Sequence, residues 1–361
     1  MKTWDVIIAG GGIIGLSLAL ELRQRGAAVL VLDRGEPGRE ASSAAAGMLA
    51  AADPETPVEL RPLAAESARL YPEFVEKLQT LSGVNVDFRQ QGTIFFGSHD
   101  FENANVPPGH RSLSSQDLER LAPALQLGEH PAFFLQEASV DPDLLLRAAV
   151  KAASHAGVEV RSHVAVKKIS ARDGNIEVSA EAESLVARMA VNCQGAWAGA
   201  PVLPRKGQMC YLQPHQPELP GVGSLRPELL NLVVRAPEAY LVPRSSGKIL
   251  VGATVEDAGF DKSVEPEVVK KLHRAAAVLI PELASASVVQ SWAGLRPGTP
   301  DDLPVMGETE TRGILISSGH FRNGILLAPV AAKIMADLIT GAPVGIDISP
   351  FSPARFATAP V

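Results

Sequence analysis

The chain has 361 residues, of which 46% are hydrophobic and 20% charged, and its formal net charge is -7. This length allows two intertwined domains with a sizeable core. The mild acidity and the lack of a basic stripe argue against a nucleic-acid-binding protein. The chain has no long run of like charges, and its 31 Gly and 28 Pro point to a loop-rich enzyme rather than a disordered chain.

The cysteines, the histidines and the apolar N-terminal segment carry no signal for a disulfide, a metal or a membrane. Cys193 and Cys210 lie far apart and match no disulfide or metal pattern, which fits a reducing compartment. The eight His are scattered without ligand spacing, so we expect no metal. Residues 6–20 are too glycine-rich and too few to span a bilayer, and no cleavage pattern follows them. We therefore expect a soluble, cytoplasmic protein.

The first 33 residues have the pattern of a dinucleotide-binding unit. Residues 4–9 and 28–32 are predicted as buried strands, and residues 13–25 between them as a helix. The turn into this helix matches G-x-G-x-x-G, in which glycines let the backbone approach a pyrophosphate at a helix N-terminus. The alternative is a turn that only packs the helix on a sheet. The predicted contacts are Gly10, Gly12, Ile13, Ile14, Gly15, Asp33 on a ribose hydroxyl, and Arg34.

Residues 41–49 are small and nearly free of charge. A helix packed tightly on a neighbour would explain this composition. The segment follows the ribose-binding acid, however, where a second close approach to a long cofactor is geometrically sensible, and FAD extends past its pyrophosphate to the isoalloxazine. We therefore predict cofactor contacts at Ala41, Ser42, Ala46, Gly47 and Met48.

The middle of the chain alternates between helix and strand signals. Helices are predicted at residues 62–81, 114–121 and 142–157, and the second and third begin with capping patterns. Residues 86–96 are expected to form one strand. Four further strand candidates, at residues 158–161, 164–169, 176–179 and 185–191, would rejoin the nucleotide-binding sheet.

From residue 209 to 292 the pattern becomes antiparallel. Strands are predicted at residues 209–212, 230–234 and 288–292, with a hairpin at 240–253 and a helix at 268–279. Arg296 stands between Gly294 and Gly298 beside Pro297, which we interpret as a tight loop. Its guanidinium fork could hold a substrate carboxylate, or it could tie the loop to Asp301 or Asp302.

A strand-like run at residues 313–318 is followed by Gly319, a turn containing Arg322, and an apolar helix. Such a turn aims backbone N–H groups and the positive end of a helix dipole at a ligand that gains negative charge. We predict cofactor contacts in this turn and at the start of the 164–169 strand, at His320, Phe321, Arg322, Asn323, Gly324, Ile325, Leu326 and Val164.

The motifs at residues 10–15, 43–49, 292–299 and 319–329 together resemble the D-amino-acid oxidase family of FAD enzymes, and in particular its glycine oxidases of thiamine biosynthesis. The resemblance implies non-covalent FAD, a small amino acid or amine as substrate, and dioxygen as the acceptor that yields hydrogen peroxide. It places Arg296 and Tyr240 on the substrate carboxylate and the backbone carbonyl of Arg322 on the amine. Met48 is expected in the same pocket.

Two positions depart from the family pattern. Glu238 replaces a histidine two residues before the tyrosine, and Val255 replaces a methionine on the returning strand. If both line the pocket, they would admit a larger or more basic amine than glycine, although Glu238 could also point into solvent.

The predicted architecture is α/β, with a Rossmann-like FAD-binding domain interrupted by an antiparallel-sheet substrate domain. We assign residues 1–82, 141–196 and 297–361 to the first domain and residues 83–140 and 197–296 to the second. A flavin dehydrogenase that passes electrons to a quinone or carrier, and a non-enzymatic flavin-binding module, are the alternative functions. We also expect a homo-oligomer.

Overall fold

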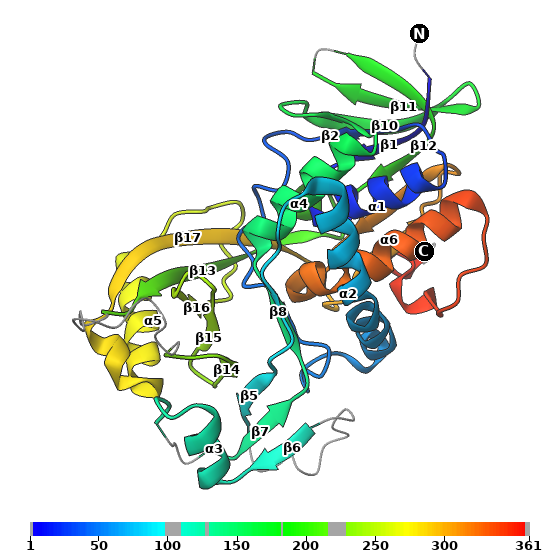
Figure 1. The fold of residues 1–361 in the computed structure, drawn as a ribbon. Coiled ribbons are helices and arrows are strands. Elements are labelled where there is room, and N and C mark those ends of the chain that lie inside the picture. Colours follow the sequence, from blue (N-terminus) through cyan, green and yellow to red (C-terminus); the bar gives the residue numbers. More distant parts are fainter. Residues whose placement is uncertain (1–2, 98–109, 127–129, 182, 216–228, 358–361) are drawn as a thin grey trace.

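The computed structural model describes residues 3–97, 110–126, 130–181, 183–215 and 229–357. It contains two eight-stranded sheets, each covered by helices, and a small three-stranded sheet between them (Figure 1). The α/β class with a Rossmann-like part and a largely antiparallel part is confirmed.

The first sheet has the strand order β10-β11-β12-β1-β2-β9, with β19 beside β12 and β18 beside β19. Parallel pairing joins β1 (Trp4–Ala9), β2 (Val29–Leu32), β9 (Glu159–Arg161), β12 (Ser184–Asn192) and β19 (Ile314–Ser318). Antiparallel pairing adds β10 (Val166–Arg172), β11 (Asn175–Ala180) and β18 (Val305–Glu308). The strand before the G-x-G-x-x-G turn, β1, and the next strand in the chain, β2, therefore lie side by side in the sheet.

One face of this sheet is covered by α1 (Ile13–Gln24), α2 (Arg61–Ser82), α4 (Pro142–His155) and α6 (Gly324–Thr340), which lie together in Figure 1. Their apolar side chains form one buried cluster with β1 and β2. Residues Phe321–Thr340 are long and apolar enough to cross a membrane, but 67% of their apolar stretch is buried inside the protein. In this fold α6 is a core helix.

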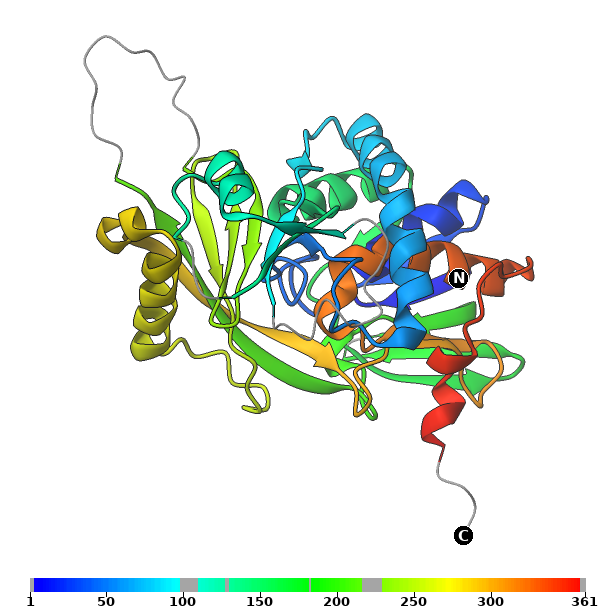
Figure 2. The ribbon, with the colours of Figure 1, turned by 90° about the horizontal axis from the view of Figure 1, so that it is seen from below.

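The second sheet has the order β17-β13-β16-β15-β14-β5-β7-β6, antiparallel except where β14 meets β5. In chain order its strands are β5 (Thr93–Phe96), β6 (His110–Leu113), β7 (Ala132–Leu135), β13 (Leu203–Gln213), β14 (Val233–Arg235), β15 (Tyr240–Pro243), β16 (Ile249–Gly252) and β17 (Ser287–Gly298). The helices α3 (Ser115–Leu121) and α5 (Pro266–Leu279) accompany it. Figure 2 shows the two longest strands, β13 and β17, running side by side toward the first sheet.

A three-stranded sheet of β3 (Met48–Leu49), β4 (Phe88–Arg89) and β8 (Ala138–Val140) joins segments from both predicted domains. The strands of the first eight-stranded sheet all fall in the ranges predicted for the FAD-binding domain, and those of the second fall in the substrate-domain ranges to within two residues at β17. The division into two domains at those boundaries remains a proposal.

Residues 41–45 form turns and a bend, which rules out the alternative of a tightly packed helix there. Two local predictions are wrong. Residues 86–96 form two strands, because Gly92 adopts a φ of 92° between them. Residues 294–298 are not a tight loop but the end of β17, where each residue pairs with β13. Proline is tolerated at position 297 because β17 is an edge strand of its sheet.

Candidate cofactor and substrate site

A long cavity lies at the carboxyl ends of β1, β2, β12 and β19 and extends to the second sheet. Its volume is about 1450 Å³, including the part that is open to solvent. Ligands of open parallel sheets bind beyond these strand ends, where neighbouring loops diverge. The cavity runs from the glycine turn at Gly10 to the Tyr240 and Arg296 side chains.

The glycine turn has the close contacts that its sequence predicts. Gly10 has a φ of 109°, and a Cβ atom there would lie 2.2 Å from the carbonyl oxygen of Cys193. Gly12 is the N-cap residue of α1, and the backbone N–H of Ile13 donates to the Ser42 hydroxyl at 3.1 Å. The positive end of the helix dipole faces the cavity, since Gly12, Ile13 and Ile14 line it. Gly15 does not line the cavity. A Cβ atom there would lie 2.0 Å from the Gly10 carbonyl oxygen, so this glycine packs helix on strand.

Asp33 lies directly after β2 and faces the cavity beside Arg34. The backbone N–H of Gly11 donates to its Oδ2 at 2.7 Å, and that of Gly35 to its Oδ1 at 2.8 Å. These bonds fix the carboxylate plane, and each oxygen keeps further acceptor capacity for a ribose hydroxyl.

The segment 41–48 forms a second wall of the cavity. Gly47 has a φ of 74°, and a Cβ atom there would lie 1.9 Å from the Val140 carbonyl oxygen. The buried guanidinium of Arg244 donates to the carbonyl oxygens of Ala46 at 2.6 Å and Val140 at 3.3 Å. Arg244 thus anchors this wall from the second sheet, a role that requires contacts distant in sequence and that sequence reasoning missed.

Arg296 and Tyr240 stand together at the other end of the cavity. Nη1 of Arg296 donates to the Thr254 carbonyl oxygen at 3.0 Å, and the Tyr240 hydroxyl donates to Sδ of Met209 at 3.1 Å. Burial raises the pKa of Tyr240 above 10.0, although the neighbouring Arg296 opposes this shift, so the phenol is neutral near neutral pH. A cation and a neutral donor on one wall suit a carboxylate.

Two glycines in neighbouring strands leave the space that the Arg296 and Tyr240 side chains occupy. A Cβ atom on Gly207 would lie 2.1 Å from Nη1 of Arg296, and one on Gly252 would lie 2.5 Å from the Tyr240 ring. Tyr240 pairs directly with Gly252, and Gly207 pairs with Gly294, two residues before Arg296. A glycine within a strand marks such close approaches, but the sequence prediction started this strand at residue 209 and missed Gly207.

The C-terminal turn has the predicted form, with β19 leading through residues 319–323 into α6. His320 is only 2% exposed, and burial lowers its pKa to about 4, so its imidazole is neutral near neutral pH. The Arg322 guanidinium donates to Oε2 of Glu55 at 2.9 Å, in a pair whose side chains are 41% and 67% exposed. This pair directs the charge of Arg322 to the surface.

The model of the family described as "FAD dependent oxidoreductase" matches residues 5–338. The chain belongs to this family. It is 34% identical to the glycine oxidase of Pseudomonas putida over 97% of this chain and 98% of that protein. It is 37% identical to the bifunctional protein ThiO/ThiG of Synechocystis over 99% of this chain, and spans about half of that relative, 54%. The crystal structure of glycine oxidase from Geobacillus kaustophilus superposes with a TM-score of 0.90 at 30% identity, covering 98% of this chain and 99% of that one.

The predicted cofactor of this FAD-dependent oxidoreductase is therefore confirmed as FAD, and the cavity fits it. Side chains at Gly10 and Gly47 would collide with the backbone carbonyls of Cys193 and Val140, so these walls keep their close packing only with glycine. The cavity joins the glycine turn, Asp33 and the second sheet in one space that FAD can occupy. Among the described residues, no group of three or more His, Cys, Asp or Glu could hold a metal ion.

The cavity contains most of the predicted site residues. Its walls include Gly10, Gly12, Ile13, Ile14, Asp33, Arg34, Ala41, Ser42, Ala46, Gly47, Met48, Val164, Tyr240, Arg296, His320, Phe321, Arg322, Gly324 and Ile325. Sequence reasoning missed further wall residues, among them Gln194, Trp197, Gly207, Met209, Gly294 and Ser318. Most of these are small or apolar residues whose position follows from strand pairing.

Five predicted residues lie outside the cavity walls: Gly15, Glu238, Val255, Asn323 and Leu326. Leu326 is buried in the helical core. Glu238 is exposed in the turn between β14 and β15, and Val255 is 60% exposed beyond the end of β16. In this structure neither Glu238 nor Val255 lines the cavity, so the expectation of a pocket shaped by these two side chains finds no support here.

Proposed function

We propose that this FAD enzyme oxidises the C–N bond of a small amino acid or amine, such as glycine, N-methylglycine or a D-amino acid. The products would be an imine, which water hydrolyses to a 2-oxo acid and ammonia (methylamine from N-methylglycine), and, with dioxygen as acceptor, hydrogen peroxide. The observation that carries the proposal is that Arg296 and Tyr240 share one cavity with the glycine turn and Asp33. A protein that only binds the cofactor needs no cation there.

The substrate carboxylate would lie against the guanidinium of Arg296, with the Tyr240 hydroxyl turned from Met209 toward it. The backbone carbonyl of Arg322, in the turn opposite, would accept from the substrate amine. When bound, FAD supplies a hydride acceptor at its N5 atom. The protein residues position the substrate and exclude water, which supplies much of the acceleration in such reactions.

No histidine on the described cavity walls is suited to act as a base near neutral pH. His320 is the only histidine on those walls, and its pKa of about 4 makes it a weak proton acceptor. The N-terminus of α6 would favour negative charge that develops in the cofactor during the reaction.

We further propose that the cofactor is held without a covalent bond. Cys193 lies on the cavity wall, but burial raises the pKa of its thiol to about 12, which keeps it protonated and unreactive. Acid precipitation should release the yellow colour into the supernatant. Colour that stays with the pellet would contradict this proposal.

The test of the reaction is a peroxide screen of the FAD-loaded protein against glycine, N-methylglycine, D-alanine and small amines without a carboxylate. We expect peroxide from the amino acids and little from the simple amines. Substrate-dependent reduction of a quinone dye without peroxide would favour the dehydrogenase alternative. No reduction of the flavin by any amine would refute the proposal.

Three further predictions accompany this function. The resemblance to glycine oxidases and to ThiO/ThiG supports use of the product in thiamine biosynthesis, which a thiamine requirement of a deletion strain would test. The cytoplasmic location and the homo-oligomer stay predictions, to be checked by cell fractionation and by light scattering of the purified protein.

A further inference from the structure

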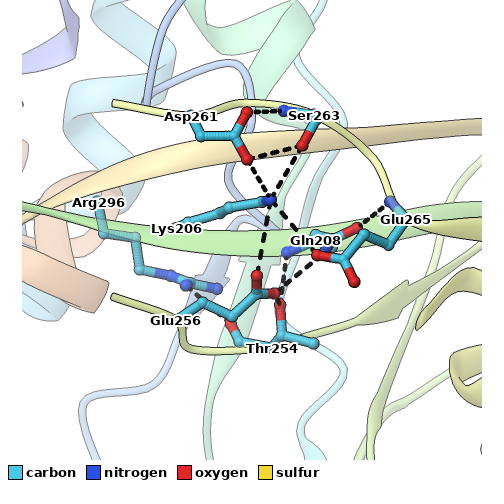
Figure 3. A network of polar contacts seen from close by, with 8 residues as sticks. All are labelled: Lys206, Gln208, Thr254, Glu256, Asp261, Ser263, Glu265 and Arg296. Atoms are coloured by element: carbon cyan, nitrogen blue, oxygen red, sulfur yellow. Dashed lines mark hydrogen bonds and ion pairs between the residues drawn. The ribbon is translucent and has the colours of Figure 1, made fainter. Parts of the chain in front are cut away.

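Lys206 is a buried cation that lies outside the cavity. It is 1% exposed and belongs to β13, whose next residue, Gly207, faces the cavity. Because side chains alternate along a strand, Lys206 points to the opposite face. Its Nζ lies 3.1 Å from Asp261, 3.7 Å from Glu256 and 3.8 Å from Glu265 (Figure 3).

These three carboxylates all belong to the segment 254–265, which follows β16 and crosses behind β13. Burial opposes the charge of Lys206, but the hydrogen bond that its Nζ donates to Asp261 and the three negative charges outweigh this effect and raise the pKa of the lysine. Lys206 is therefore charged and holds three carboxylates that would otherwise repel one another.

Gln208, two residues further along the same face, fastens the start and the end of this segment. Its side-chain amide donates to Oε1 of Glu256 at 3.0 Å and accepts from the backbone N–H of Glu265 at 2.8 Å. Its backbone N–H donates to Oγ1 of Thr254 at 2.9 Å, and the Thr254 hydroxyl also bonds the Glu256 carboxylate. Lys206 and Glu256 in addition exchange two backbone hydrogen bonds of 2.9 Å.

This network ends on the substrate side at Arg296. The Thr254 carbonyl oxygen accepts from Nη1 of Arg296 at 3.0 Å, while the guanidinium lies over Gly207. Strand β13 thus carries Lys206 on one face and contacts the guanidinium of Arg296 on the other. Figure 3 shows the eight residues of the network, with Nζ of Lys206 among the carboxylates of Asp261, Glu256 and Glu265.

We propose that Lys206 is a positioning residue for the substrate clamp: by holding the segment 254–265 on β13, it fixes the Thr254 carbonyl that orients Arg296. This inference rests on the proposed function, in which Arg296 binds a carboxylate. It adds that carboxylate binding depends on a charged lysine outside the cavity, on the opposite face of β13.

The test measures acetate binding to the FAD-loaded protein through the change in flavin absorbance, together with KM and kcat for the best amino acid. Lys206→Met should weaken acetate binding and raise KM by about tenfold, with kcat changed less than about twofold. Lys206→Arg should come closer to wild type. Asp261→Asn keeps Lys206 but removes the charge of the carboxylate nearest to its Nζ, and it should also weaken acetate binding, which keeps the inference testable if Lys206→Met does not fold. Thr254→Val removes the hydroxyl that bonds Gln208 and Glu256 and tests the other attachment of the same carbonyl.

The matched control is Lys270→Met, which removes an exposed lysine paired with Glu267 on α5 and should leave acetate binding unchanged. The double variant of Lys206→Met and Arg296→Ala isolates the coupling. If Lys206 acts through Arg296, its substitution has no further effect once Arg296 is alanine.

Wild-type acetate binding in a folded Lys206→Met protein would overturn the inference, as would a full Lys206→Met effect on top of Arg296→Ala. Failure of the proposed function has a different signature. In that case Arg296→Ala alone would bind acetate as wild type does.

Discussion

The guanidinium of Arg296 occupies the space where a side chain of Gly207 would lie, with Nη1 only 2.1 Å from the position of a Cβ atom. The two residues belong to neighbouring strands, β17 and β13, and Gly207 pairs with Gly294. The site therefore depends on a glycine that no catalytic motif contains.

Gly207→Ala should displace the Arg296 side chain, because the methyl group and the guanidinium cannot both fit. We expect acetate affinity to fall and KM for the amino acid to rise by about 10- to 100-fold, equivalent to about 1.4–2.8 kcal/mol, while bound flavin is retained. Titration of flavin absorbance measures the affinity. The control is Gly345→Ala, at an exposed position where a Cβ atom meets nothing within 4 Å. Unchanged acetate affinity in Gly207→Ala would show that Arg296 does not hold the carboxylate in this geometry.

Tyr240→Phe should weaken acetate binding modestly, by about three- to tenfold, because it removes one neutral hydrogen-bond donor and leaves Arg296 in place. Since burial raises the pKa of the phenol above 10.0, the wild-type hydroxyl remains protonated below that pH. Acetate affinity, which involves no substrate amine, should therefore show no loss from Tyr240 ionisation between about pH 8 and 10. A decline over that range in wild type that disappears in Tyr240→Phe would mean that the phenol ionises earlier than its burial implies.

His320 should make stability depend on pH. Its pKa is lowered from 6.5 to about 4 in the folded protein, so the unfolded chain binds more protons between these values. The neutral imidazole thus contributes stability that is present above pH 6.5 and is lost as the pH falls toward 4. Linkage gives a loss of about 2 kcal/mol between pH 7 and pH 5 from this residue.

Urea unfolding of wild type and His320→Leu at pH 7 and pH 5 measures this contribution. The loss of unfolding free energy on acidification should be smaller in the variant by about 2 kcal/mol, whatever the variant's stability at pH 7. Equal losses in the two proteins would contradict the lowered pKa.

Tyr71 should stabilise α6 by bonding a carbonyl that the proline inside that helix leaves without its usual partner. Pro329 has no N–H for the carbonyl of Ile325, and the buried Tyr71 hydroxyl donates to that carbonyl at 3.2 Å. Tyr71→Phe should therefore cost about 1–2 kcal/mol of unfolding free energy. In a Pro329→Ala background the helix can bond its own carbonyl, so the cost of Tyr71→Phe should be smaller. Equal costs in both backgrounds would refute the link.

Short-range patterns predicted the parts of the site that a single segment builds. The glycine turn, Asp33 and the turn before α6 were found because turn chemistry and the adjoining strands and helices lie in consecutive residues. Long-range pairing decided the rest. Lys206 contacts carboxylates that lie 50 or more positions away in the chain. The sequence around Arg296 predicts a loop because Gly294, Pro297 and Gly298 give a loop composition to an edge strand. Glu238 and Val255 were assigned from resemblance, and the turn after β14 and the end of β16 carry both into solvent.

For Arg322, the contribution of the side chain can be measured separately from that of the backbone carbonyl. Its guanidinium pairs with Glu55 at the surface, and exposed pairs contribute only about 0–1 kcal/mol. If the residue acts through its carbonyl oxygen, Arg322→Ala should keep its flavin and lose less than about threefold in kcat/KM, whereas Arg296→Ala should lose most of its activity. Steady-state kinetics of the two variants, with Glu55→Gln as the control for the surface pair, measures the difference. The backbone carbonyl is present in every variant. If kcat/KM falls as much in Arg322→Ala as in Arg296→Ala while Glu55→Gln is unaffected, the guanidinium of Arg322 itself takes part in the reaction.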